Sequence, residues 1–132
     1  MPGILPDTGD MNIEIKLKRV YEPAEEGDGL RILVDRMWPR GIKKSDLKCD
    51  IWAKEVAPSP EARHFFHDDP EGNWEKFSER YRSELRSGEA LCQLAEKIRE
   101  SRQDTVTLIF GFRNPLKNHA LILKDELSSL LR

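Results

Sequence analysis

The chain has 132 residues, which is the size of one globular domain. Five phenylalanines, three tryptophans and two tyrosines exclude a wholly disordered chain. Lys and Arg number 22 and Asp and Glu number 24, so the formal net charge is -2. This near balance excludes nucleic-acid binding through bulk charge alone, and it leaves room for a local basic cluster.

Cysteine usage and hydropathy predict a cytoplasmic protein. Cys49 and Cys92 have neither metal-ligand spacing nor a disulfide framework around them, which is typical of a reducing compartment. The longest apolar runs are about six residues, whereas a membrane-spanning helix needs about twenty, so no membrane association is predicted. Prolines and glycines near the start predict a disordered leader over residues 1–11, followed by one domain over residues 12–132.

The first half of the domain contains two predicted strands. Alternating apolar and charged residues over 11–20 predict a half-buried strand, and the apolar run 30–34 predicts a central strand. The acid- and glycine-rich stretch 22–29 between them predicts an exposed loop. Ser45 is the predicted cap of a short helix that ends at residue 48. Residues 50–57 fit either a strand or a helix.

The second half is mainly helical by its apolar periodicity. Amphipathic spacing predicts helices over 60–66, 71–87 and 91–98. The pair Ser59-Pro60 supplies the cap and first residue of the first of them. Residues 105–110 predict a buried strand, and Asn114-Pro115 predicts the start of a final helix. Strands that alternate with helices predict an α/β fold with a mainly parallel central sheet flanked by helices.

Two arginine-bearing loops follow the predicted central strands, at 35–41 (DRMWPRG) and 111–115 (GFRNP). In open parallel sheets ligands bind beyond the carboxyl ends of the strands, and guanidinium groups pair with phosphate or carboxylate. We therefore predict a small anionic ligand bound by Arg19, Arg36, Trp38, Arg40, Arg113, Asn118 and His119. The alternative is that the arginines form ordinary salt bridges with acids, and that the indole only fixes its loop.

Acids and histidines near these loops are the candidates for transferring protons to or from a ligand. Asp35, at the end of the second predicted strand, is the first candidate for a catalytic base, and Glu55 and His67 are the others. His64 and His67 are one helical turn apart, but no third ligand accompanies them, so no metal site is predicted. No nucleophile motif, dinucleotide fingerprint or phosphate-binding loop occurs, so no cofactor is predicted.

Several segments resemble one known family. They are RVY at 19–21, LVDRMWPRG at 33–41, WAKEVAPS at 52–59, HDDP at 67–70, FSERYRSEL at 77–85 and TLIF at 107–110. On these segments the chain resembles the YeaO-like proteins, the domain-of-unknown-function family 488. The resemblance implies a single-domain cytosolic bacterial or archaeal protein with a Rossmann-like layered α/β fold, and it implies no settled activity. The loop 111–119 keeps an Asn-His pair but lacks the acids typical of the family.

Three functions fit these features. The first is a small enzyme or sensor that binds a phosphate- or carboxylate-bearing ligand at the arginine cluster; whether it catalyses a reaction stays open. The second is a structural or interaction protein in which the arginines only stabilise the fold. The third is a nucleic-acid-associated module in which Trp38 stacks on a base and a basic set contacts phosphates, namely Arg31, Arg36, Arg40, Lys43 and Lys44. The sequence predicts no reaction and no oligomeric state.

Overall fold

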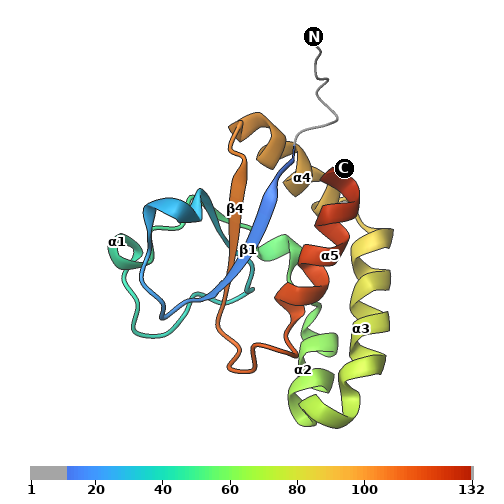
Figure 1. Ribbon diagram of the computed structural model, residues 1–132. Helices are drawn as coiled ribbons and strands as arrows, with labels where there is room; N and C mark the ends of the chain where they lie inside the picture. The colour runs from blue at the N-terminus through green and yellow to red at the C-terminus, as the bar shows by residue number, and fades with distance from the viewer. Residues whose placement is uncertain (1–11, 132) are drawn as a thin grey trace.

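A parallel four-stranded sheet lies at the centre of the computed structural model, which describes residues 12–131 (Figure 1). The strands are β1 (Glu14–Arg19), β2 (Leu30–Leu33), β3 (Ile51–Trp52) and β4 (Thr105–Phe110). Their order across the sheet is β1-β4-β2-β3, and each neighbouring pair is parallel. The carboxyl ends of β2 and β4 are therefore adjacent. The leader predicted over residues 1–11 lies outside the described residues.

Helices connect the strands and cover the sheet. They are α1 (Lys44–Leu47), α2 (Pro60–Asp68), α3 (Pro70–Ser87), α4 (Ala90–Ser101) and α5 (His119–Leu131), with short 3-10 turns η2 (Glu26–Asp28) and η3 (Lys54–Val56). The predicted α/β class and parallel sheet are confirmed, while the narrower Rossmann-like description stays a prediction. None of the helices within residues 12–131 has the length and apolar character needed to cross a membrane.

The sheet has two unlike faces because successive side chains along a strand point to opposite sides. Val106, Leu108 and Phe110 of β4 belong to the main core, together with side chains of α2 to α5. The other face carries a smaller apolar cluster of Val20, Leu33, Leu47 and Ile109. Figure 1 shows α5 and α3 on one side of the strands and α1 on the other. The main core therefore anchors the helices that border the carboxyl edge of the sheet.

Helix α2 begins as its sequence predicts, and α3 begins one residue before its predicted start. The Ser59 hydroxyl accepts a hydrogen bond from the Ala62 amide at 3.1 Å, and Pro60 is the first helical residue. The Asp69 carboxylate accepts one from the Gly72 amide at 3.2 Å and starts α3. Helix α2 continues to Asp68, two residues beyond its predicted end. The Asp69 cap lies in the turn between α2 and α3 and fixes it beside the sheet edge.

Two predicted helix starts are wrong. Helix α1 is preceded by Lys43 without a side-chain cap, so Ser45 lies inside the first turn. Helix α5 begins at His119, because the Asn114 side chain accepts a hydrogen bond from the Leu116 amide at 2.9 Å and forms a local turn. The ambiguous stretch 50–57 contains both kinds of structure, the short strand β3 and the 3-10 turn η3. Local hydrogen bonds of asparagine compete with helix formation, which explains the later start of α5.

Candidate functional site

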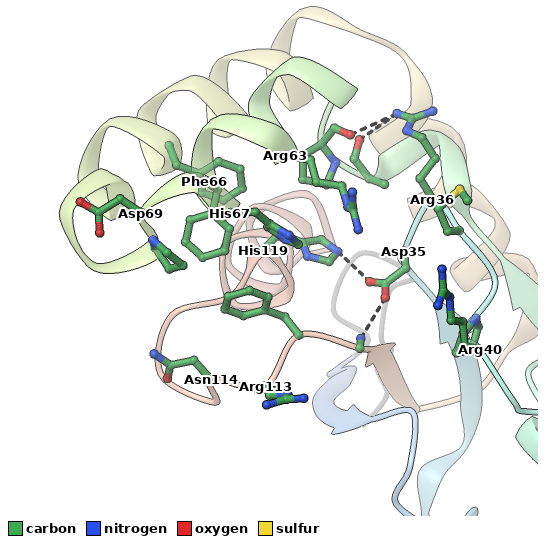
Figure 2. A pocket seen from close by; sticks show the side chains of 18 of the residues that line it. Asp35, Arg36, Arg40, Arg63, Phe66, His67, Asp69, Arg113, Asn114 and His119 are labelled. Atoms are coloured by element: carbon green, nitrogen blue, oxygen red, sulfur yellow. Dashed lines mark hydrogen bonds and ion pairs between the residues drawn. The ribbon is translucent and has the colours of Figure 1, made fainter.

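The two arginine loops border one pocket at the carboxyl edge of the sheet. The pocket has a volume of about 950 Å³ and lies between the loop after β2, the loop after β4 and the turn that joins α2 to α3 (Figure 2). The loops meet because β2 and β4 are neighbours in the sheet. Of the residues predicted to form a site, those that line the pocket are Asp35, Arg36, Trp38, Arg40, His67, Arg113 and His119.

Three predicted site residues lie outside the pocket lining. Arg19 donates to the Gly111 carbonyl at 3.3 Å and its guanidinium lies 5.2 Å from the ring centre of Tyr21, so it supports the β4 loop from behind. Buried Asn118 caps α5 by accepting a hydrogen bond from the Leu121 amide at 3.1 Å. Glu55 is exposed on η3. Two of these residues therefore position the pocket rather than line it.

Four arginines line the pocket: Arg36, Arg40, Arg63 and Arg113. Among residues 12–131, no ion pair joins any of these four side chains to an acid. Arg36 donates to the carbonyls of Ala57 and Pro58 at 3.4 and 3.3 Å, and its buried Nε has no hydrogen-bond partner. The arrangement leaves guanidinium donors available in the pocket.

Arg63 is a lining residue that the sequence analysis missed. It comes from α2 and lies four residues before His67, so both side chains share one face of that helix. Figure 2 shows it between the labelled Arg36 and His119, above Asp35. The i, i+4 spacing was the signal in the sequence that could have found it.

Asp35 joins the two loops and helix α5. One carboxylate oxygen accepts a hydrogen bond from the Gly111 amide at 2.9 Å, and the other lies 3.3 Å from Nε2 of His119. Because Nε2 also lies 3.0 Å from the Val34 carbonyl, which only accepts, this nitrogen carries the proton and directs it to that carbonyl. The second Asp35 oxygen is therefore left without a hydrogen bond.

Gly111 permits this close approach. A Cβ at that position would lie 3.0 Å from the Asp35 carboxylate, which is tighter than ordinary van der Waals contact. Gly41 has a different reason to be glycine, since its φ is 76° and a Cβ would have open space around it. A close backbone approach therefore occurs at Gly111 and not at Gly41.

Burial sets the charge state of the titratable groups in the pocket. It raises the pKa of Asp35, although the nearby His119 opposes the shift. Burial lowers the pKa of His119, and burial together with Arg63 lowers the pKa of His67. Both imidazoles are therefore neutral near pH 7, and the arginines carry the positive charge of the pocket.

Two tryptophans hold the loop after β2. The indole N–H of Trp38 donates to the Ile42 carbonyl at 2.7 Å, and that of Trp52 donates to the Asp35 carbonyl at 2.8 Å. The two rings meet edge to face with centroids 5.3 Å apart. Trp38 thus fixes its loop, as the alternative interpretation of the sequence held, and it also lines the pocket.

Aromatic side chains form the end of the pocket near the turn between α2 and α3. The Phe112 ring lies 4.9 Å from Phe66 and 5.1 Å from His67, measured between centroids. Phe66 in turn stacks on buried Phe77 at 4.5 Å. Phe66 and Phe112 were not predicted as site residues, because their apolar spacing is typical of core positions.

The described pocket lining offers carboxylate and imidazole groups but none of the hydroxyl, thiol or amine nucleophiles of covalent catalysis. It contains no serine, threonine, cysteine, tyrosine or lysine. Nor do residues 12–131 contain a group of three or more His, Cys, Asp or Glu side chains placed to hold a metal ion. The lining is suited to binding through guanidinium hydrogen bonds and aromatic contact.

Comparisons with known proteins agree with the family resemblance. A family described as "Inactive DUF488-N3 subclade" matches residues 14–132. The chain is 46% identical over 122 residues to "Uncharacterized protein YeaO" of Escherichia coli (strain K12), which covers 89% of this chain and 100% of that protein. It is 40% identical over 114 residues to "Uncharacterized protein Rv3073c" of Mycobacterium tuberculosis, which covers 86% of this chain and 93% of that protein. No solved structure matches the chain.

Proposed function

The chain belongs to the family described as "Inactive DUF488-N3 subclade", and we propose that it binds a small phosphate- or carboxylate-bearing ligand without catalysing a reaction on it. The observation that carries this proposal is the set of four arginines around one pocket, none of them paired with an acid among residues 12–131. Guanidinium groups satisfy phosphate and carboxylate oxygens by paired hydrogen bonds.

The acids that line the pocket support an anionic ligand because two of the three are already engaged. Asp69 caps α3, and Glu71 pairs with Lys117 at 2.6 Å. Asp35 is the remaining acid beside the arginines, and the burial that raises its pKa disfavours its charged form. Positive charge therefore exceeds negative charge in the pocket.

Two observations favour binding over reaction. The family description carries the word inactive, and the described lining offers no hydroxyl, thiol or amine nucleophile. Under this proposal Asp35 positions the two loops, and His67 contributes to the wall. A sensor that reports ligand occupancy through these loops fits such a pocket.

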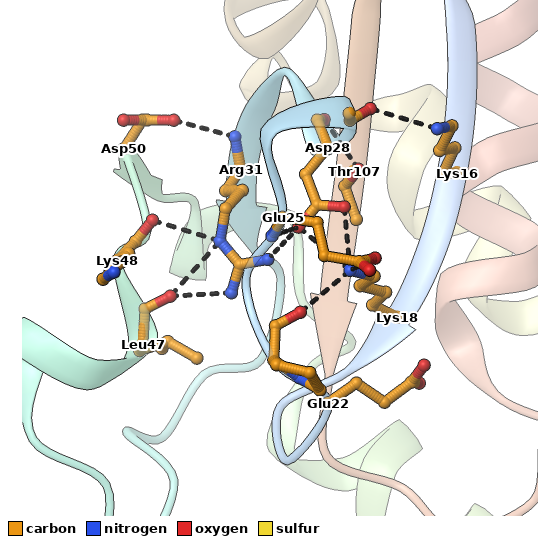
Figure 3. Close-up of polar contacts among 12 residues, drawn as sticks. Lys16, Lys18, Glu22, Glu25, Asp28, Arg31, Leu47, Lys48, Asp50 and Thr107 are labelled. Atoms are coloured by element: carbon orange, nitrogen blue, oxygen red, sulfur yellow. Dashed lines mark hydrogen bonds and ion pairs between the residues drawn. The ribbon is translucent and has the colours of Figure 1, made fainter.

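The alternative functions have less support. If the pocket arginines only stabilised the fold, each would be paired with an acid. Among the described residues, none of the four forms an ion pair. The nucleic-acid interpretation included Arg31 as a phosphate contact. Arg31 is buried and donates to Asp28 and to the carbonyls of Leu47 and Lys48 (Figure 3), so its donors are already used.

Isothermal titration calorimetry at low ionic strength and pH 7 tests the proposal, with inorganic phosphate, pyrophosphate and citrate as separate probes. We expect at least one probe to bind with a Kd below about 1 mM. Loss of a hydrogen bond to a charged group costs about 1.5–3 kcal/mol, so Arg40→Gln and Arg113→Gln should each weaken that binding by about tenfold or more. Both side chains are exposed, so the variants keep the fold.

Arg102→Gln is the matched control. Arg102 is exposed between α4 and β4, at the amino edge of the sheet and opposite the pocket, and the substitution removes the same charge. We expect its binding to equal that of the wild type. The proposal is wrong if no probe releases or absorbs heat with folded protein, or if Arg102→Gln weakens binding as much as Arg40→Gln does.

A further inference from the structure

The pocket is larger and more varied than a site for a simple inorganic anion. Its volume of about 950 Å³ is at the upper end of the range, about 300–1,000 Å³, typical of sites for drug-sized ligands. Its two ends also differ in chemistry. Figure 2 shows Arg36 and Arg40 at one end, and Phe66, Asp69 and Asn114 at the other. A ligand that fills both ends needs an anionic group joined to a part that suits aromatic walls.

The aromatic end presents a wall of rings that support one another. Phe112 is half-buried and braced by Phe66 at 4.9 Å, and buried Phe77 supports Phe66 in turn. The neutral imidazole of His67 lies 5.1 Å from the Phe112 ring and extends the same wall. Rings held in this way lose little conformational freedom when a second ring packs on them, and such walls favour planar heteroaromatic groups.

The same end offers a hydrogen-bond acceptor at its rim. One oxygen of Asp69 receives the Gly72 amide, which leaves the other oxygen of this exposed carboxylate free to accept. Asn114 also lines the pocket, and its side-chain oxygen already accepts from the Leu116 amide. An acceptor beside an aromatic wall matches a heterocycle that carries an amino group at its edge.

We propose that the ligand is a nucleoside monophosphate whose base carries an amino group. The base packs on Phe112 and His67 with its amino edge toward Asp69, and the phosphate lies among the arginines. A phosphate carries about two negative charges and three acceptor oxygens, so it satisfies several guanidinium groups where one carboxylate would not. This inference rests on the proposed anion-binding function and adds the class of ligand.

Calorimetry with paired ligands tests the role of the base. The probes are AMP, GMP and CMP, with ribose 5-phosphate as the ligand that keeps the sugar phosphate and lacks the base. Stacking of one base on an aromatic side chain strengthens binding by roughly tenfold. We expect at least one of the three nucleotides to bind the wild-type protein about tenfold or more tightly than ribose 5-phosphate.

Phe112→Leu should remove this preference. The variant keeps an apolar side chain and loses the ring, so its Kd values for the nucleotide and for ribose 5-phosphate should become equal within about threefold, while ribose 5-phosphate binds as it does to the wild type. Phe65→Leu is the control, because Phe65 is also on the α2 side of the core but does not line the pocket. It should leave the preference intact.

The outcomes separate this inference from the proposed function. If ribose 5-phosphate binds the wild-type protein as tightly as every nucleotide, the ligand class is wrong and anion binding stands. If neither the nucleotides nor ribose 5-phosphate, phosphate, pyrophosphate or citrate bind, the proposed function fails as well. The comparison of ligands on the wild-type protein needs no variant to fold, so it decides the question even if Phe112→Leu is unstable.

Discussion

The protein uses arginine in two contrasting regions. On the sheet face opposite the main core, Arg31, Asp28, Lys18 and Glu25 form a paired charge cluster (Figure 3). At the carboxyl edge, the four pocket arginines have no acid partner among residues 12–131. The first region satisfies its charges within the fold, and the second leaves them available.

Burial explains why the paired charge cluster is complete. The side chains of Asp28 and Arg31 are 3% and 6% exposed, so an unpaired charge there would lack both water and a partner. Lys18 contacts one Asp28 oxygen at 2.9 Å and Glu25 at 2.7 Å. Burial would raise the pKa of Asp28, but hydrogen bonds from Lys18, the Glu25 amide and Arg31 outweigh it and lower the pKa.

The pocket arginines can stay unpaired because water reaches the pocket. Arg40 and Arg113 are exposed, so their unpaired charges cost little without a ligand. The pKa of Asp35 is raised, whereas that of Asp28 is lowered, although both are acids beside a strand of the same sheet. The contrast teaches that the paired charge cluster stabilises the fold and that the pocket charges contribute little to it.

The largest expected effect is on the paired charge cluster. Asp28→Ala leaves the buried Arg31 guanidinium without its carboxylate, and breaking a buried pair in this way costs about 3–5 kcal/mol. Urea denaturation should show this loss in the free energy of unfolding. Glu25→Ala is the control, because Glu25 contacts the same lysine but is 67% exposed, and its loss should cost about 1 kcal/mol or less. Equal losses in the two variants would contradict the comparison.

A pH series sharpens the comparison at His119. Its pKa is lowered in the folded protein, so the unfolded state takes up a proton first as the pH falls through about 6.5, and stability is lost below that pH. His119→Gln keeps an N–H donor for the Val34 carbonyl and cannot titrate. Between pH 6.5 and 5 the wild type should lose up to about 1.4 kcal/mol per pH unit relative to the variant. Parallel curves for the two proteins would show that His119 is not responsible.

Asp35→Asn should show the opposite pH dependence at a smaller cost. A raised pKa in the folded state means that stability from this group is present below about pH 3.8 and is lost as the pH rises. The amide oxygen of the variant still accepts from Gly111, so we expect a loss of at most about 1 kcal/mol at pH 4 and a relative gain toward pH 7. Denaturation at both pH values measures this. A loss at pH 7 comparable to that of Asp28→Ala would remove the contrast between the two acids.

The smallest effects are expected at the exposed pocket arginines. Arg40→Gln and Arg113→Gln should each change the free energy of unfolding by about 0.5 kcal/mol or less, because neither side chain has an ion-pair partner to lose among the described residues. Thermal melts of the two variants beside the wild type check this. A loss above about 2 kcal/mol in either variant would place that arginine with the stabilising charges.

Local chemistry in the sequence was enough for most elements. The alternation along β1 and the apolar runs of β2 and β4 predicted these strands to within a few residues, and the Ser59 cap was predicted as well. The Asp69 cap of α3 was not predicted. The start of α5 was missed because Asn114 and Asn118 both carry cap chemistry, and only one of them has a helix behind it. Such a choice depends on where the chain packs next.

The candidate site divides in the same way. The sequence showed arginines just after two predicted strands. Three of them, Arg36, Arg40 and Arg113, line the same pocket. The sequence alone determined that arginines stand at the ends of two buried strands. Only the tertiary structure decided that Arg63 joins them and that Arg31 is buried in a charge cluster, because partners distant in the chain are set by strand order and helix packing.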